Sequence, residues 1–381
     1  MKEDLVLPAT RATGDDAAPE PLLKVSGLVK HFPVKGGFPI RRTVGAVQAV
    51  DGLDLTVHAG ESFGLVGESG CGKSTTGRLI TRLLEPTRGT ITYRGRDISH
   101  ANRKQLAPIR SEIQMIFQDP YSSLNPRQTV GKIISGPMEI NGINPEGGRE
   151  KRVRELLDIV GLNPEHYNRF PHEFSGGQRQ RIGVARALAL EPKLIVADEP
   201  VSALDVSIQA QVVNLLQQVQ KELGIAFLFI AHDLAVVRHF SQRVAVMYLG
   251  KIIEVGDRDS IYTRPRHPYT HALLSAVPEV TLAEEETPAR ERIRLAGDVP
   301  SPISPPSGCR FRTRCWKAQD KCAAEEPPLI QLSGNRADHL TACHFPEDPT
   351  TEARDEDIVL DPALTALEEA AATDTEAARE G

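Results

Sequence analysis

The chain has 381 residues, of which 40% are hydrophobic and 25% charged, with a formal net charge of −6. That length allows two or three domains, and the composition is ordinary for a globular protein. No apolar run approaches the roughly 18 to 20 residues of a membrane-spanning helix, and no basic patch interleaved with aromatic residues indicates nucleic-acid binding.

The N-terminal part begins with a segment that is not expected to fold. Residues 1–20 mix acidic residues with Pro, Ala and Thr and lack the apolar core of a secretory signal, so we expect disorder there. Residues 25–66 read as several short strands, and Thr90–Tyr93 reads as a further strand. Together these strands predict an antiparallel part of the fold.

Residues 67–74, GESGCGKS, match the phosphate-loop pattern G-x-x-x-x-G-K-[ST]. They follow the apolar run Phe63–Val66 and precede a helical pattern over 76–84. In this context backbone N–H groups and a helix N-terminus favour phosphate. Lys73 can reach the β- and γ-phosphates, and the Ser74 hydroxyl can coordinate Mg²⁺. The alternative is a chance glycine loop, which the strand–loop–helix context disfavours, so the pattern predicts a nucleoside triphosphate site.

A helical stretch over 119–173, with a helix at Glu150–Val160, leads into residues 174–181, FSGGQRQR. Ser175, Gly176 and Gly177 open a helix expected over 178–190 and offer hydroxyl and N–H donors to an anion. They can equally be read as a helix cap, and the two interpretations are compatible.

Residues 194–199, LIVADE, are an apolar run that ends in two carboxylates. Such a run is typical of a buried parallel strand, whose carboxyl end faces ligands. Asp198 can hold Mg²⁺ through water, and Glu199 can polarise the water that attacks the γ-phosphate. Taken alone the pair would more often start a helix, but the preceding phosphate loop favours catalysis. A helix over 207–222 and strands over 226–230 and 243–256 are expected next.

Taken together, these motifs resemble those of the ABC ATPases, with Phe174 where leucine is commoner in the signature. The resemblance implies a P-loop α/β cassette at 21–257: a mostly parallel sheet, an antiparallel β subdomain and a helical subdomain at about 119–175. It also implies that the signature of one subunit serves the γ-phosphate of the nucleotide held by the opposite subunit.

The same resemblance assigns roles to single residues. Gln118 matches the Q-loop residue that touches Mg²⁺ and water, Asp205 lies in the D-loop, and His232 matches the switch histidine, although a lone histidine is usually structural. Phe32 would stack on adenine, unless it is core or another ring in 33–42 does so. The implied catalytic residues are Glu199, His232 and Gln118; the Mg²⁺ ligands are Ser74, Gln118 and Asp198; the ATP-binding residues are Phe32, Gly67, Ser69, Gly70, Cys71 (backbone only), Gly72, Lys73, Ser74, Thr75, Ser175, Gly176, Gly177, Gln178 and Asp205.

Residues 266–274, RHPYTHALL, and 118–127, QDPYSSLNPR, resemble the ATPases of peptide and nickel importers, the latter segment resembling the second ATPase of dipeptide and oligopeptide importers. The likeness covers about residues 20–346. It implies an ATPase at the cytoplasmic face of the membrane, in a head-to-tail dimer with a second, paralogous ATPase, on two permeases served by an external binding protein. The alternatives are a soluble ABC ATPase acting on ribosomes or DNA, and an exporter subunit.

Four cysteines, Cys309, Cys315, Cys322 and Cys343, fall in a C-terminal domain expected at 258–346. A reducing compartment disfavours disulfides, and the spacing differs from the paired C-x₂-C of zinc ribbons. Four thiolates suit a [4Fe–4S] cluster, whose charge the interleaved arginines 310, 312 and 314 could offset. Some importer ATPases that resemble this chain are thought to carry one. Zn²⁺ and plain structural thiols are the alternatives.

Residues 347–381 carry twelve acidic residues against two arginines and no aromatic residue. This composition predicts a disordered, solvated tail. The composition favours an inert tail over one that binds a partner.

Overall fold

The computed structural model describes residues 20–36, 42–276, 293–332 and 338–347. The two segments expected to be disordered, 1–20 and 347–381, lie outside the described residues except for Glu20 and Glu347. Glu347 is tied to the fold, because its carboxylate lies 3.2 Å from Nζ of Lys317 and its N–H donates to the Arg266 carbonyl over 2.8 Å. Within these ranges no helix has the length and apolar character needed to cross a membrane.

The central sheet has eight strands in the order β11-β12-β10-β9-β3-β8-β7-β6. Five neighbouring strands, from β9 to β6 in this order, run parallel to one another. All residues of β3, β7 and β8 are buried, which explains why these strands read as unbroken apolar runs. β10 then pairs antiparallel with β9. The parallel strands are β3 (Ser62–Val66), β6 (Ile113–Ile116), β7 (Leu194–Asp198), β8 (Ala226–Ala231) and β9 (Arg243–Tyr248), followed by β10 (Lys251–Asp257).

A second sheet of four antiparallel strands has the order β2-β1-β4-β5. The expectation of several short strands over 25–66 was wrong. β1 and β2 instead form one long hairpin, paired from Leu23 with Val57 to Gly36 with Arg42 through several register shifts. Such bulges interrupt the alternation of apolar and polar residues without ending the strand, so the sequence suggested breaks. The strands are β1 (Leu23–Gly36), β2 (Arg42–Val57), β4 (Arg88–Tyr93) and β5 (Arg96–Asp97).

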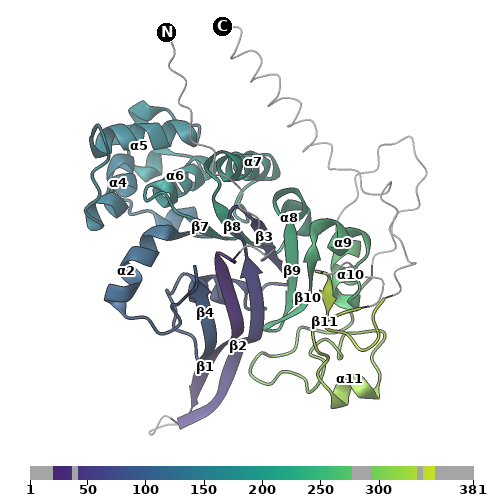
Figure 1. Cartoon of the computed structure of the whole chain (residues 1–381). Coiled ribbons are helices and arrows are strands. Elements are labelled where there is room, and N and C mark those ends of the chain that lie inside the picture. Colours follow the sequence, from purple (N-terminus) through teal and green to yellow (C-terminus); the bar gives the residue numbers. More distant parts are fainter. Residues whose placement is uncertain (1–19, 37–41, 277–292, 333–337, 348–381) are drawn as a thin grey trace, which may run out of the picture.

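Helices α4 to α7 gather at the end of the molecule opposite to β1 and β2 (Figure 1). The helices expected at 150–160, 178–190 and 207–222 are confirmed within two residues by α5, α6 and α7. Among the helical elements are α1 (Lys73–Ile80), α2 (Arg103–Glu112), α3 (Pro120–Ser123), α4 (Val130–Ile140), α5 (Gly148–Ile159), η1 (Pro164–Asn168), η2 (Pro171–Glu173), α6 (Gly176–Leu188), α7 (Val206–Leu223) and α8 (Leu234–Phe240).

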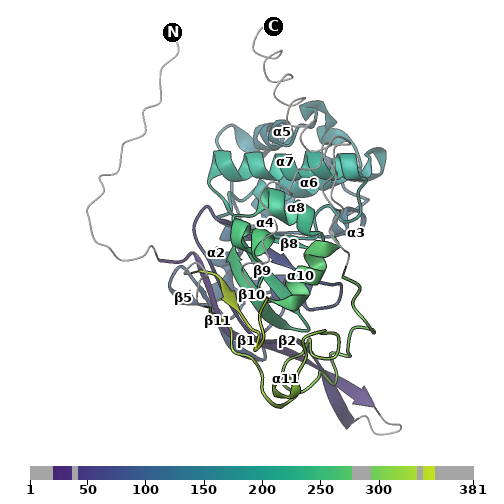
Figure 2. The same cartoon turned by 90° about the vertical axis from the view of Figure 1, so that its right-hand side faces the viewer.

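The C-terminal part extends the central sheet. β12 (Leu340–Thr341) pairs with β10 and with β11 (Ile330–Gln331), and Figure 2 shows this part lying beside β10. The helices here are α9 (Arg258–Thr263), α10 (Pro268–Ser275) and α11 (Asp320–Ala324). The expected boundary between residues 257 and 258 therefore crosses a shared sheet, and the domain limits stay a prediction.

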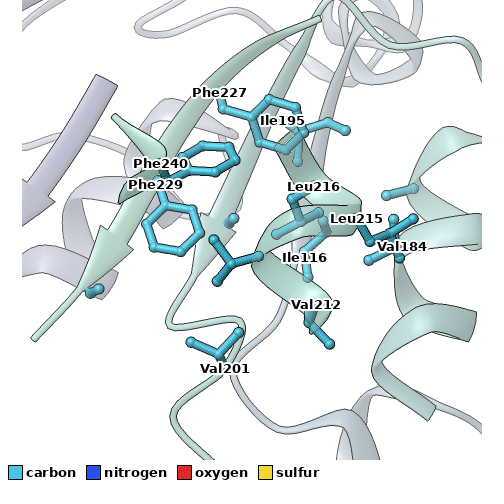
Figure 3. Packing of buried hydrophobic residues seen from close by; sticks show 14 of the residues in the cluster. Ile116, Val184, Ile195, Val201, Val212, Leu215, Leu216, Phe227, Phe229 and Phe240 are labelled. Carbon is cyan, nitrogen blue, oxygen red and sulfur yellow. The ribbon is translucent and has the colours of Figure 1, made fainter. Parts of the chain in front are cut away.

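Aromatic packing fixes the strands that carry the site. Phe227 and Phe229 of β8 contact Phe240 of α8, with ring centroids 5.4 and 4.6 Å apart, and Leu216 of α7 lies on the same side of the sheet (Figure 3). All these side chains are buried. The carboxyl ends of β7 and β8 are thereby held in a close-packed frame.

Replacement of Phe229 by alanine tests this frame. We expect Phe229→Ala to lower the free energy of unfolding by about 3–5 kcal/mol, because it leaves a cavity in a packed core. Leu223→Ala, at the exposed end of α7, is the matched control and should change it by less than about 0.5 kcal/mol. Urea denaturation measures both, and equal losses would contradict the assignment.

Candidate functional site

The phosphate loop joins β3 to α1 and depends on two glycines. Gly67 has φ 154° and Gly72 has φ 110°, which other residues rarely adopt. A Cβ atom at Gly67 would lie 2.1 Å from the Met247 carbonyl oxygen, and one at Gly72 would lie 2.0 Å from the Ala49 oxygen. The loop is thus pressed against β9 and β2, and only glycine fits at either position.

Lys73 and Ser74 are the first two residues of α1, which follows the phosphate loop at the carboxyl end of β3. The Lys73 side chain is 3% exposed, and its Nζ donates to the carbonyl oxygens of Gly67 and Glu68 over 2.7 and 3.0 Å. The Ser74 hydroxyl donates to Oδ1 of Asp198 over 2.7 Å. Burial raises the pKa of Asp198, and the Ser74 hydrogen bond only partly opposes it. A hydroxyl and a carboxylate oxygen side by side are the hard ligands that suit Mg²⁺.

Three residues expected to be catalytic meet at Glu199. Its Oε2 accepts a hydrogen bond of 2.9 Å from Nε2 of Gln118 and lies 3.4 Å from Nδ1 of His232, while Oε1 lies 3.8 Å from Nζ of Lys73. These residues follow β6, β7, β8 and β3, whose carboxyl ends share one edge of the sheet. Glu199 is held at φ 45°, which costs about 1–2 kcal/mol for a residue with a side chain. Strain of this kind is typical of functional sites.

The signature forms the N-terminus of α6. Ser175 is the N-cap and forms a capping box with Gln178, so the helix-cap interpretation holds in this structure. A Cβ atom at Gly177 would lie 2.4 Å from Cγ2 of Ile208, so this glycine allows close packing on α7. Ser175 is exposed, and its hydrogen bonds stay within the signature segment. Of the three expected donor residues, Ser175 is therefore exposed, Gly176 is half-buried and Gly177 is buried.

The other expected residues lie in β1, at the start of α7 and along the phosphate loop. Phe32 is half-buried in β1, with Nζ of Lys30 5.2 Å from its ring centroid, so it is not part of the core. Asp205 is exposed and caps α7 through its carbonyl oxygen, which accepts the N–H groups of Ile208 and Gln209. The remaining loop residues, Ser69, Gly70, Cys71 and Thr75, lie along the phosphate loop and the start of α1; burial raises the pKa of the Cys71 thiol.

Two residues that contact the phosphate loop were missed as site residues. The Glu68 N–H donates to the Tyr269 hydroxyl over 3.0 Å, and the Glu68 carboxylate accepts two hydrogen bonds, of 2.8 and 3.3 Å, from Arg314. The sequence marked Tyr269 only as part of the HPYT segment and Arg314 only as a charge between cysteines. The sequence carries no signal for these contacts beyond the polar side chains themselves. Residues that meet from such distant positions in the chain leave no local pattern.

The four C-terminal cysteines line one small pocket, together with Arg312, Lys317 and two histidines, and none of them forms a disulfide. Burial raises the pKa of Cys309 and Cys315, and it raises that of Cys343 to about 12. Among the described residues, no group of three or more His, Cys, Asp or Glu side chains is arranged to hold a metal ion.

The arginines expected to offset a cluster's charge point in different directions. Arg312 lines the pocket, but Arg310 donates to Asp51 of β2 and Arg314 to Glu68. The prediction that all three arginines offset the charge of a cluster was therefore wrong, because two of them pair with carboxylates of the nucleotide-binding part.

Comparison with known proteins gives two family matches and many relatives. Residues 50–202 match the family described as ABC transporter, and 253–322 match the C-terminal region of oligopeptide and dipeptide transporters. A putative oligopeptide transport ATP-binding protein, YkfD of Bacillus subtilis (strain 168), is 52% identical over 88% of this chain and 98% of its own. The dipeptide transport ATP-binding protein DppF of Haemophilus influenzae is 48% identical over 85% of this chain and 96% of its own.

Solved structures give the same result for the fold. The dimeric post-hydrolysis ATP-binding cassette MJ0796, bound to ADP and Pi, is 29% identical with a TM-score of 0.55 and covers 62% of this chain and 98% of its own. The structure of cbiO1 from Clostridium perfringens, described as part of the ABC transporter complex cbiONQ, has a TM-score of 0.54 and 29% identity, and covers 64% of this chain and 90% of its own. These likenesses confirm the predicted fold class.

Proposed function

This chain belongs to the ATP-binding proteins of the oligopeptide and dipeptide ABC transporters and is an ATPase, and we propose that it powers peptide import through the site around Glu199. The observation that carries this proposal is the convergence of Gln118, His232 and Lys73 on one carboxylate beside the phosphate loop. The relatives named as peptide transport proteins favour neither a ribosome- or DNA-directed ATPase nor an exporter.

Each residue of the site has a physical task in this proposal. The loop N–H groups and Lys73 bind the phosphates, with Ser74 and Asp198 as oxygen ligands for Mg²⁺ and Gln118 beside them. Glu199 polarises the attacking water, and His232 contacts the γ-phosphate. Mg²⁺, when bound, neutralises charge that develops on the phosphates. Phe32 stacks on adenine, and the loop residues Ser69, Gly70, Cys71 and Thr75 complete the cradle.

The exposure of Ser175 at the N-terminus of α6 supports a second subunit as the source of the remaining contacts. Ser175, Gly176, Gly177 and Gln178 of one chain would face the nucleotide of the other, with Asp205 at the dimer interface. We propose a head-to-tail pair with a paralogous ATPase at the cytoplasmic face of the membrane. In this arrangement the helical segment 119–175 of the cassette, 21–257, docks on two permeases, which an external binding protein supplies with peptide.

We also propose a [4Fe–4S] cluster at the four cysteines of the C-terminal domain, 258–346. The described structure shows no group of three or more His, Cys, Asp or Glu side chains arranged to hold a metal, so the thiols would have to move together to bind it. Four free thiols share one pocket with the cations of Arg312 and Lys317, which suits a cluster of negative net charge. Burial favours neutral thiols in the metal-free chain, so binding would release protons. The cluster would hold this domain together, and Zn²⁺ is the second candidate.

The first test concerns Glu199. Glu199→Gln should reduce ATP turnover at least about 100-fold while ATP still binds, since the amide keeps the shape but cannot act as a carboxylate on water. Phosphate release and nucleotide binding measure the two effects. Near-normal hydrolysis would remove Glu199 from this role.

The second test separates binding within one chain from binding across the dimer. Lys73→Ala should weaken ATP binding to the isolated chain, because it removes the cation that faces the phosphates. Ser175→Arg should leave that binding unchanged and instead block ATP-dependent dimerisation, measured by light scattering. If both variants weaken binding to the isolated chain equally, the trans-acting role of Ser175 is wrong.

The third test concerns the cysteines. Anaerobically purified protein should be brown, with broad absorption near ~400 nm and about four irons per chain at full occupancy. Replacement of any one of Cys309, Cys315, Cys322 or Cys343 by serine should bleach it and loosen the C-terminal domain, with ATP binding retained. One zinc per colourless chain would favour Zn²⁺, and no metal would leave plain thiols.

A further inference from the structure

Glu68, the second residue of the phosphate loop, connects the loop to the C-terminal part of the chain. Its carbonyl oxygen accepts a hydrogen bond from Lys73, its N–H donates to the Tyr269 hydroxyl, and its carboxylate is paired with Arg314. One loop residue is therefore fixed at its backbone and at its side chain by residues that lie outside the P-loop cassette. We propose that Arg314 and Tyr269 are positioning residues that hold the phosphate loop in its nucleotide-binding geometry through Glu68.

The burial of these groups makes the restraint strong. The side chains of Arg314 and Glu68 are 9% and 27% exposed, and the paired oxygens give a two-point contact. A charge-assisted pair of this kind is stronger and more directional than an exposed ion pair. Burial alone would lower the pKa of Arg314, but its hydrogen-bond and charge interactions with Glu68 and Tyr248 together outweigh burial and raise it.

Tyr269 is itself immobilised by aromatic packing. It is fully buried, and its ring centroid lies 4.7 Å from that of Tyr248 and 5.3 Å from that of Phe311. Phe311 lies between Cys309 and Cys315, so the cysteine-bearing segment supports both residues that hold Glu68. The hydroxyl of Tyr269 thus offers a fixed acceptor for the loop N–H.

The charge on Glu68 predicts the direction in which loss of Arg314 changes nucleotide binding. A carboxylate in the phosphate loop repels the triphosphate that the loop binds, and this repulsion grows where solvent screening is weak. Arg314 neutralises that carboxylate and also draws it away from solvent toward the C-terminal part. Loss of Arg314 should therefore weaken nucleotide binding for two reasons: the carboxylate of Glu68 would repel the triphosphate, and the phosphate loop would be less ordered.

Arg312 provides a matched control. It lies in the same segment, but its guanidinium donates to the carbonyl and hydroxyl oxygens of Ser307, and no hydrogen bond from it to the phosphate loop is found among the described residues. Arg314→Met and Arg312→Met remove the same group two residues apart. Metal content measured in both variants separates an effect on the cysteines from an effect on the loop.

The inference rests on the proposed nucleotide site, so the experiment includes Lys73→Ala. Binding of MgATP to the full-length chain is measured by calorimetry for Arg314→Met, Glu68→Gln, the double variant and Arg312→Met. We expect Arg314→Met to bind about 10-fold more weakly and the double variant to recover part of that loss, since the unpaired carboxylate is then absent. Arg312→Met should bind like the unaltered chain. In the assembled transporter, Arg314→Met should raise KM with kcat changed less than about two-fold.

Tyr269→Phe is a second variant, which keeps the packed ring and removes only the acceptor. We expect it to weaken binding about three-fold. If Arg314→Met binds MgATP like Arg312→Met, or if the losses of Arg314→Met and Glu68→Gln multiply in the double variant, the positioning role is wrong. If Lys73→Ala binds MgATP normally, the nucleotide site itself is misassigned.

Discussion

The site depends on the parallel order of β6, β7, β8 and β3. Neighbouring parallel strands end at the same edge of the sheet. Gln118, Glu199, His232 and the phosphate loop therefore lie close together although they are far apart in the sequence. Both faces of these strands are covered, so the sheet cannot slip or tilt without breaking a packed core. The positions of the site residues at this edge are therefore fixed by the apolar packing of the strands that carry them.

Charge at this edge is arranged around two buried groups. Lys73 is almost fully enclosed and is satisfied by loop carbonyls, while Asp198 is buried against the Ser74 hydroxyl. Burial disfavours the charged form of Asp198, so the carboxylate gains most from a nearby cation. The pair is thus suited to a ligand that brings phosphate charge and Mg²⁺ together, because the phosphates offset the charge of Lys73 and Mg²⁺ offsets that of Asp198.

Much of this could be predicted from the sequence because the relevant signals are local. The phosphate loop, the apolar run ending at Glu199 and the helix after Ser175 each occupy a few consecutive residues with a strict physical requirement. The β1–β2 hairpin was misjudged because its bulges mimic strand ends. The contacts of Glu68 with Arg314 and Tyr269 could not be predicted, since pairing across such distances depends on the three-dimensional fold.

The addition of β12 to the edge of the sheet at β10 bears on how the chain is synthesised. Glu254 pairs with Thr341, and the Gln48 N–H donates to the Pro302 carbonyl, so late residues complete surfaces formed by early ones. At roughly 5–20 residues per second, a ribosome needs several seconds to pass from one strand to the other. During that interval β10 presents an unpaired edge, which other chains could join. The strand that covers this edge is therefore among the last parts of the described fold to be made.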